Sequence, residues 1–337
     1  MKRLLLVLGL AASVSAFGQK LTAPNVLTLR GHIEFLASDL LEGRDTPSRG
    51  LDIAAQYIAS SFMQIGLEPG AKGSYFQEAE YTNRRSNTTA KVRNVVGLLK
   101  GTDPKLAATY VVVSAHYDHL GMREMEGDGI FNGANDDASG VAGVIECARA
   151  LFAQKPKRSI LFVCYWGEEK GLQGSREFVK NGPVPLYDIV ANVNLEQIGR
   201  TDDSEGPRVA TANVTGFDYT SITGFLTSAA KPAGIKMEKH PQFSDGYFFS
   251  SDNASFALQG VPAVTVSTAY SFPDYHKVGD HADKLDYDNL AKIIHMAAGG
   301  ILGIAKSAKA PEWNKENPKT ERYLKAWENL QKSRPAG

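Results

Sequence analysis

Two adjacent carboxylates follow one of the most apolar segments of the chain. Glu168 and Glu169 come almost directly after the apolar run at residues 159–165. A continuous apolar run of this length is typical of a strand buried on both faces of a parallel sheet, and open α/β sheets bind their ligands beyond the carboxyl ends of such strands. The pair can therefore divide two tasks, with one carboxylate binding a metal ion and the other moving protons.

Two other apolar runs also end in side chains that can bind a metal. The run at 109–115 is followed by His116, and the run at 189–195 is followed by Glu196. His276 lies in a loop after the strand predicted at 263–266. Because the carboxyl ends of parallel strands meet at one edge of a sheet, we expect these three side chains to lie near Glu168 and Glu169.

A pair of aspartates, Asp136 and Asp137, precedes the helix predicted at 141–151. Two divalent ions about 3.5–4 Å apart need a carboxylate that bridges them, together with further ligands for each ion. The sequence offers Asp136 as the bridge. Asp137 could itself be the bridge, but its place at the helix start fits a cap better. The predicted ligands are His116 and Glu196 for the first ion, Glu169 and His276 for the second, and Asp136 for both.

Glu168 is left without a ligand role in this scheme. It is the predicted general base, which takes the proton of a water bridging the metals and returns it to the leaving amine. Asp118 lies two residues after His116, so it points the same way along extended chain and can accept the second ring N–H of that histidine. His119 and His281 are interpreted as surface histidines without a role in the chemistry.

Helical and strand-like patterns alternate along most of the chain, which predicts an α/β domain with a mostly parallel mixed sheet and helices on both faces. We expect one such domain at 19–309 and a tail with a short docking helix at 310–337. The predicted helices not yet mentioned are at 29–41, 51–67, 217–230, 251–259 and 286–308, and the predicted strand-like segments at 75–79 and 92–99.

Composition and the first residues limit the possible functions. The 337 residues carry 37 basic and 37 acidic side chains, so nothing suggests a nucleic-acid partner. Residues 1–18 have a basic head, an apolar centre and a small-residue end, which predicts a signal peptide and a periplasmic or secreted protein. The apolar centre is shorter than the roughly 20 residues that span a bilayer, so no stable membrane anchor is expected.

The two cysteines cannot supply a thiolate zinc site, so any metal must be held by histidine and carboxylate. Whether Cys147 and Cys164 pair is left open.

Several motifs resemble those of metallopeptidase family twenty-eight, the zinc aminopeptidases and glutamate carboxypeptidases, in its exported bacterial form. The resemblance runs from about residue 36 to 286 and keeps the family's motif order. Its segments are LASDLLEGR at 36–44, HYD at 116–118, GANDDASG at 133–140, EEKGLQGS at 168–175, NLE at 194–196 and DYH at 274–276.

This resemblance implies a phosphorylase/hydrolase-like three-layer sandwich that binds two Zn²⁺ ions per chain. It also implies an exopeptidase that acts on peptides, with aminopeptidase as the leading activity. In related enzymes a tyrosine beside the last histidine helps to polarise the scissile carbonyl, which makes Tyr275 a candidate for stabilising the oxyanion.

The chain departs from the family pattern in three respects. Glu196 stands where the family commonly has aspartate, which keeps the ligand type but adds a methylene. Asn253 replaces the histidine of a common Ser-Asp-His segment. There is also no room before Asn94 for the protease-associated insertion of many exported relatives, so we expect a more open site.

Several alternatives stay open. Carboxypeptidase or dipeptidase activity depends on whether Arg200 or Arg208 lies near the metals, which the sequence does not show. A glutaminyl cyclase, an acyltransferase with one zinc ion, would share the architecture, and so would a binding protein that has lost turnover. Side-chain specificity and oligomeric state are not predicted.

Overall fold

A computed structural model describes residues 21–83 and 86–335, so the predicted signal peptide lies outside the described residues. These residues form a nine-stranded central sheet with the order β1-β3-β7-β4-β8-β13-β11-β12, and β2 pairs with β3. The strands are β1 Glu68–Pro69, β2 Phe76–Asn83, β3 Thr88–Leu99, β4 Tyr110–His116, β7 Ser159–Tyr165, β8 Ile189–Leu195, β11 Thr211–Val214, β12 Lys236–Glu238 and β13 Ala263–Ser267.

The four middle strands, β7, β4, β8 and β13, run parallel to one another. Antiparallel pairing occurs on both sides of them, through β3 on β7 and through β11 on β13. The predicted α/β class with a mixed sheet and helices on both faces is therefore confirmed.

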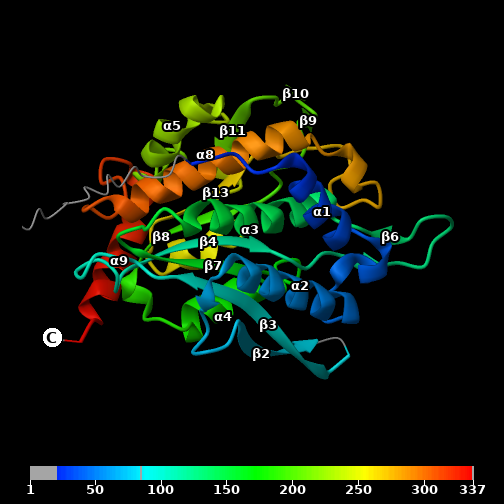
Figure 1. The fold of residues 1–337 in the computed structure, drawn as a ribbon, viewed down its shortest axis with the longest axis horizontal. Helices are drawn as coiled ribbons and strands as arrows, with labels where there is room; N and C mark the ends of the chain where they lie inside the picture. The colour runs from blue at the N-terminus through cyan, green and yellow to red at the C-terminus, as the bar shows by residue number, and fades with distance from the viewer. Residues whose placement is uncertain (1–20, 84–85, 336–337) are drawn as a thin grey trace, which may run out of the picture.

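Helices cover both faces of the sheet (Figure 1). One face carries α1 Val26–Leu36, α2 Arg49–Ile65, α3 Ser139–Phe152, α5 Ile222–Ala233 and α8 Tyr287–Lys306, and the other carries α4 Gln173–Asn181, α7 Asn253–Leu258 and α9 Glu321–Lys332. No described helix combines the length and the apolar character that a bilayer crossing requires.

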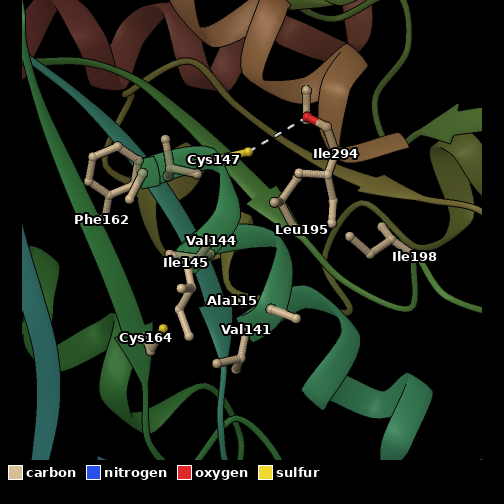
Figure 2. Packing of buried hydrophobic residues seen from close by; sticks show 14 of the residues in the cluster. Ala115, Val141, Val144, Ile145, Cys147, Phe162, Cys164, Leu195, Ile198 and Ile294 are labelled. Atoms are coloured by element: carbon tan, nitrogen blue, oxygen red, sulfur yellow. Dashed lines mark hydrogen bonds between the residues drawn. The ribbon is translucent and has the colours of Figure 1, made fainter. Parts of the chain in front are cut away.

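The larger apolar core lies between the sheet and the layer that contains α3 and α8. Figure 2 shows Val141 of α3 near Ala115 of β4 and the side chain of Ile145 directed toward Cys164 of β7, all within this core. Cys147 lies in this core with its Sγ 3.8 Å from the carbonyl oxygen of Ile294. Both cysteines are buried free thiols, so the disulfide that the sequence left open is not formed.

The most apolar strands agree with their predicted bounds, since β7 and β8 occupy 159–165 and 189–195. The helix predicted at 29–41 was too long, because α1 ends at Leu36 and a kinked turn, η1 (Asp39–Arg44), follows with Gly43 at φ 66°. The helix predicted from 217 begins only at Ile222. Short elements such as β11, β12 and α4 were not predicted, since a few residues carry too little periodicity.

The last described helix, α9, lies on the face that also carries α4 and α7. Tyr323 of α9 is 2% exposed and its ring stacks on Trp313 with the centroids 4.6 Å apart. Aromatic packing therefore anchors the segment between α8 and α9. Near the end of the described residues, Arg334 lies 2.9 Å from Asp188.

Candidate metal centre

Strand ends of the parallel region bring the predicted ligands together. β4 ends at His116, Glu168 and Glu169 follow β7, and Glu196 follows β8 directly. These strands are parallel neighbours, so their carboxyl ends share one edge of the sheet. The chemistry-bearing side chains consequently meet there although they are up to 80 residues apart in the chain.

The first cluster consists of His116, Asp136 and Glu196, which offer ligand atoms that all lie within 4.8 Å of one another. The Nε2 atom of His116 lies 3.2 Å from Oδ1 of Asp136. His116 is 1% exposed, and Asp136 is also buried. These are the three side chains predicted for the first ion.

The second cluster surrounds the other oxygen of the same aspartate. Nε2 of His276 lies 3.3 Å from Oδ2 of Asp136 and 3.3 Å from Oε1 of Glu169. The two oxygens of Asp136 thus face different imidazoles, His116 on one side and His276 on the other. This is the arrangement that a bridging carboxylate requires.

The donor set fits divalent metal ions. Ligands at roughly 2.0–2.1 Å from a tetrahedral zinc ion lie about 3.3 Å from one another, and the imidazole–carboxylate distances of 3.2 and 3.3 Å match that spacing. The buried atoms His116 Nε2 and Glu169 Oε1 have no hydrogen-bond partner among the described residues. Buried polar atoms are rarely left unpaired, so a ligand outside the chain is expected to satisfy them.

His119 corrects one interpretation from the sequence. Instead of lying at the surface, it is fully buried, and its Nδ1 lies 2.9 Å from Oε1 of Glu169. The ligand atoms of His119, Asp136 and Glu169 all lie within 4.8 Å of one another, so His119 adjoins the second cluster, which already contains His276. The sequence carried no signal for this, because the direction of a side chain in the turn after a strand does not follow the strand's alternation.

The loop that carries Asp136 is held by a second aspartate. The Asp280 carboxylate accepts the backbone N–H groups of Asn135 and Asp136, each at 3.0 Å. Asp280 is buried, and burial raises its pKa to about 6. Sequence reasoning missed this residue because it acts on backbone groups about 145 positions away.

A buried arginine fixes the two segments that carry His116 and Asp136. The Arg44 guanidinium donates to the carbonyl oxygens of Tyr117 at 2.9 Å, Asn132 at 2.7 Å and Gly133 at 3.0 Å, and also to that of Leu36. Burial lowers the pKa of Arg44 to about 10. The only signal for Arg44 in the sequence was its place in the segment at 36–44.

Asp118 contacts His116 differently from the prediction. Nδ1 of His116 pairs with the backbone oxygen of Asp118 at 3.1 Å, whereas the nearer carboxylate oxygen lies 3.6 Å away. The carboxylate accepts the backbone N–H of Glu168 at 3.0 Å and the hydroxyl of Thr46 at 3.3 Å. The backbone of Asp118 therefore orients the imidazole, and its side chain holds the Glu168 segment.

Glu168 precedes Glu169 in the turn after β7, but it belongs to neither group of described side chains with metal-ligand spacing. Burial raises its pKa well above the ordinary value, and the nearby carboxylates of Glu196 and Glu169 raise it further. Asp137 lies just before α3, whose N-cap position is Ala138. Its carboxylate accepts the backbone N–H groups of Gly140 at 2.9 Å and Gln197 at 3.2 Å, so it connects the first turn of α3 to the segment after β8.

Tyr275 stacks on His276 with the ring centroids 3.9 Å apart. Its side chain is partly exposed, and burial together with the carboxylates of Asp136 and Glu196 raises the pKa of its hydroxyl. The hydroxyl therefore stays protonated and able to donate a hydrogen bond at neutral pH.

A cavity of about 490 Å³ adjoins the centre and has Glu196 in its wall. Aromatic rings form part of the wall, and hydroxyl groups lie between them. The residues that matter here are Tyr247, Tyr270, Phe272, Tyr275, Ser251 and Thr265. The cavity opens beside the first cluster, so a bound molecule can contact the wall and the metal ligands together.

The two arginines that the sequence could not place are both engaged by acids. Arg200 binds Asp202 at 2.5 Å and Asp274 at 2.9 Å, and Arg208 lies 3.3 Å from Glu205. Neither offers an unpaired guanidinium to the centre.

Asn253, which stands where the family commonly has histidine, forms hydrogen bonds between α7 and its neighbours. It donates to the carbonyl oxygen of Phe248 at 3.0 Å and accepts the hydroxyl of Thr265 at 2.8 Å. Its amide thus joins α7 to β13 beneath the cavity wall, and the contact it makes does not involve the predicted ligands.

Comparison with known proteins identifies a family whose sequence model matches this chain. The model described as "Peptidase family M28" matches residues 94–300, more than half of the chain. A relative from Pyrenophora tritici-repentis, described as a probable zinc metalloprotease, is 29% identical over 267 residues, which cover 77% of this chain and 59% of the relative. The chain thus spans about three-fifths of that relative's length.

Solved structures share the fold. The zinc aminopeptidase BSAP from Bacillus subtilis has a TM-score of 0.66 at 17% identity and covers 88% of this chain and 100% of its own. A glutaminyl cyclase from Bacteroides thetaiotaomicron has a TM-score of 0.65 at 18% identity, with coverage of 83% and 99%. At these identities the likeness concerns the fold alone.

Proposed function

Because the chain belongs to peptidase family M28, we propose that it is an exopeptidase that uses two Zn²⁺ ions to remove the N-terminal residue of peptides. The ligands are His116 and Glu196 for one ion, Glu169 and His276 for the other, and Asp136 for both. Glu168 is the general base.

The observation that carries this proposal is the position of Asp136 between two imidazoles. One of its oxygens lies 3.2 Å from His116 and the other 3.3 Å from His276. Each side also has a carboxylate of its own, Glu196 or Glu169. One carboxylate shared by both ions and one further carboxylate for each ion suit a centre with two metals. Glu168 has no ligand role in this assignment and can act as the base.

The two zinc ions, when bound, supply positive charge that acidifies water and polarises the scissile carbonyl. Glu168 accepts the proton of the attacking water and gives it to the leaving amine. Its raised pKa suits the first step, since a carboxylate with a higher pKa takes up the proton more readily. Asp118 keeps Glu168 in place through the backbone N–H.

Tyr275 donates from its hydroxyl to the oxygen on which negative charge develops. The stack on His276 places its ring beside the second cluster. Because the ring is partly exposed, the hydroxyl reaches substrate without a movement of the core.

An N-terminal substrate amine suits the charges around the centre. Glu196 contributes to both the first cluster and the cavity wall, so a carboxylate lies where substrate enters. The nearby Arg200 is neutralised by Asp202 and Asp274 and is not free to bind a terminal carboxylate. The ammonium of Lys277, which also lines the cavity, donates to the carbonyl oxygen of Pro273. We therefore favour an aminopeptidase over a carboxypeptidase, with the side chain of the released residue in the 490 Å³ cavity.

Peptides with blocked ends test the direction of cleavage. The wild-type protein loaded with zinc is incubated with one peptide in three forms: free at both ends, acetylated at the N-terminus, and amidated at the C-terminus. We expect release of the first amino acid from the free and the amidated forms, and none from the acetylated form. Release of the last amino acid, abolished by amidation, would indicate a carboxypeptidase.

Glutaminyl cyclase activity is a second candidate, because a glutaminyl cyclase shares the fold. The complete second cluster disfavours it, since a single-zinc enzyme has no need for a second imidazole–carboxylate set. A peptide with N-terminal glutamine distinguishes the two reactions: the peptidase releases glutamine, whereas the cyclase loses ammonia and keeps the residue. A chain that binds zinc and peptide without turnover would instead be a binding protein.

We further propose that the protein is exported to the periplasm or beyond. The support is the basic, apolar and small-residue pattern of residues 1–18. Mass spectrometry of the mature protein tests this, with a new N-terminus near residue 16 or 18 as the expected result.

A further inference from the structure

We propose that His119 is a third imidazole ligand of the metal centre and binds the same ion as Glu169 and His276. The inference rests on the two-metal centre proposed above and goes beyond the five ligands assigned there. It makes the two metal sites unequal, with four side-chain ligands on one ion and three on the other.

The burial and the unpaired nitrogens of His119 are the first observation. The residue follows β4 and is fully buried, and its backbone N–H donates to the carbonyl oxygen of Arg44 at 3.2 Å. Neither ring nitrogen has a hydrogen-bond partner among the described residues. A buried neutral imidazole with both nitrogens unpaired is costly, so an external group is required to satisfy it.

The contact with Glu169 has the geometry of two ligands, not of a hydrogen bond. Nδ1 of His119 and Oε1 of Glu169 lie 2.9 Å apart, yet both atoms lack a hydrogen-bond partner because the ring N–H direction misses the oxygen. His116 Nε2 likewise has no hydrogen-bond partner among the described residues, although it lies 3.2 Å from Oδ1 of Asp136. The ligand atoms of His119, Asp136 and Glu169 all lie within 4.8 Å of one another, as those of His116, Asp136 and Glu196 do.

The ring is held in one orientation by its neighbours. Gly133 has φ 59°, and a Cβ atom there would lie 2.6 Å from Cγ and Cδ2 of His119, so only glycine leaves room for the ring. On another side the ring meets His276 edge-on, with centroids 5.8 Å apart and an interplanar angle of 70°. Two imidazoles are thus fixed next to Glu169, and a preorganised ligand loses little entropy on binding.

The alternative is that His119 only orients Glu169 through a hydrogen bond. In that role Nδ1–H would point at Oε1, and the other nitrogen, Nε2, would find a partner elsewhere. Neither condition is met, since both nitrogens are unpaired. A glutamine side chain can imitate a hydrogen-bonding imidazole but is a poor zinc ligand, which makes the two roles separable.

Unequal sites have a consequence for metal exchange. The ion held by Asp136, Glu169, His276 and His119 is the tighter one, because it has one more side-chain ligand. The ion held by His116, Asp136 and Glu196 keeps more positions for water and substrate and exchanges more easily. Zinc loading of the metal-free chain is therefore expected to occur in two separate steps.

Zinc titration of the metal-free full chain, with a chromophoric chelator as competitor, tests the proposal. The proteins are the wild type, His119→Ala, His119→Gln and the control His281→Gln, which changes an exposed histidine 3.5 Å from Asp128. Loss of an outer hydrogen-bond partner weakens metal affinity by roughly 10–100-fold. We expect both His119 variants to weaken the tighter step by more than about 100-fold, with the second step retained and the control unchanged.

A loss below about tenfold, or restoration of affinity by His119→Gln, would overturn the proposal and indicate a positioning role. Zinc X-ray absorption of the wild type gives a second result that does not depend on the folding of a variant. Three imidazoles per two zinc ions are expected, whereas two would overturn the inference. Neither measurement uses peptide hydrolysis, so an inactive protein with three imidazoles would contradict the proposed function and leave this inference standing.

Discussion

Glu168 and Glu169 are neighbours in the chain but have different surroundings. Oε1 of Glu169 lies 2.9 Å from His119 and 3.3 Å from His276, whereas the backbone of Glu168 is tied to Asp118. Adjacent carboxylates in a turn after a strand can thus face different partners, which separates metal binding from proton transfer. The roles assigned to them lead to opposite mutational outcomes.

Replacement of Glu168 by glutamine should remove turnover and keep metal. The amide has nearly the same shape but cannot accept the proton, and general-base catalysis contributes typically 10²–10⁴-fold. We expect kcat to fall by about that factor, with the zinc content of the purified variant equal to that of the wild type by elemental analysis. Unchanged turnover would exclude Glu168 as the base.

Replacement of Asp136 by alanine should remove the metal itself. Both ions share this carboxylate, so its loss weakens both sites and leaves His116 and His276 without their common neighbour. We expect less than one zinc ion per chain after dialysis, measured against the exposed-site control Asp128→Asn. Two retained ions in Asp136→Ala would disprove the bridging role.

At the level of elements, the sequence predicted the strands best where burial is complete. β7 and β8 are unbroken apolar runs in the sequence, and a proposed ligand follows each of them, Glu196 directly after β8 and Glu169 four residues after β7. Most of the metal cluster could therefore be predicted together with these strands. Arg44 and Asp280 could not be predicted, because they act on backbone groups of segments 73 to 145 residues away. The prediction that His119 lies at the surface was wrong, because the burial of a turn residue depends on which residues pack over it, here Gly133.

Arg44 connects η1 to the metal-binding turns, and its replacement by methionine should weaken both. The change leaves the carbonyl oxygens of Tyr117, Asn132 and Gly133 without this donor, and each unsatisfied buried group costs about 1–3 kcal/mol. We expect the free energy of unfolding in chelator to fall by roughly 3 kcal/mol or more.

Urea denaturation gives this value, and the control is Arg30→Met, which removes an exposed pair with Glu34. A loss equal to that of the control would show that Arg44 does not hold these segments.

The contact between α1 and α3 predicts a pH effect on stability. Burial alone would raise the pKa of Glu146, but hydrogen bonds with His32 and Arg149 outweigh it, and the pKa is lowered from 4.5. A carboxyl with a lowered folded pKa stabilises the protein above its unfolded pKa, and this stabilisation is lost as the pH falls through the folded value.

Glu146→Gln should therefore be less stable than the wild type at pH 7, and the gap should narrow below about pH 4.5. Urea unfolding of both proteins across this range measures the gap. Both proteins contain the same metal centre, so the pH dependence of that centre cancels in the difference between their free energies of unfolding. A gap that is constant with pH would contradict the assigned contact.

For the whole molecule, the sheet brings acidic side chains together at one edge, where bound cations would stabilise them. Asp136, Glu169, Glu196 and Glu168 lie near one another there, and Asp280 is buried and holds the loop of Asp136. Close carboxylates repel one another in a low-dielectric site, so the metal-free protein stores unfavourable electrostatic energy. The parallel order of β7, β4 and β8 requires this crowding, because it aligns their carboxyl ends.

Removal of zinc should consequently lower the thermal midpoint. A ligand that binds only the folded chain adds about 2.7 kcal/mol at a free concentration of 100 times its Kd. We expect calorimetry to show a clear upward shift of the midpoint on addition of zinc to the chelator-treated wild type, and a smaller shift for Asp136→Ala. Equal shifts in both proteins would mean that zinc stabilises the fold from another site.

The most direct measurement of the central claim is peptide hydrolysis during zinc titration of the metal-free wild type. The account predicts that release of the N-terminal amino acid rises until two zinc ions are bound per chain, while Glu168→Gln binds the same two ions and stays inactive. Full activity at one ion, or no amino-acid release when two are bound, would contradict a two-zinc aminopeptidase.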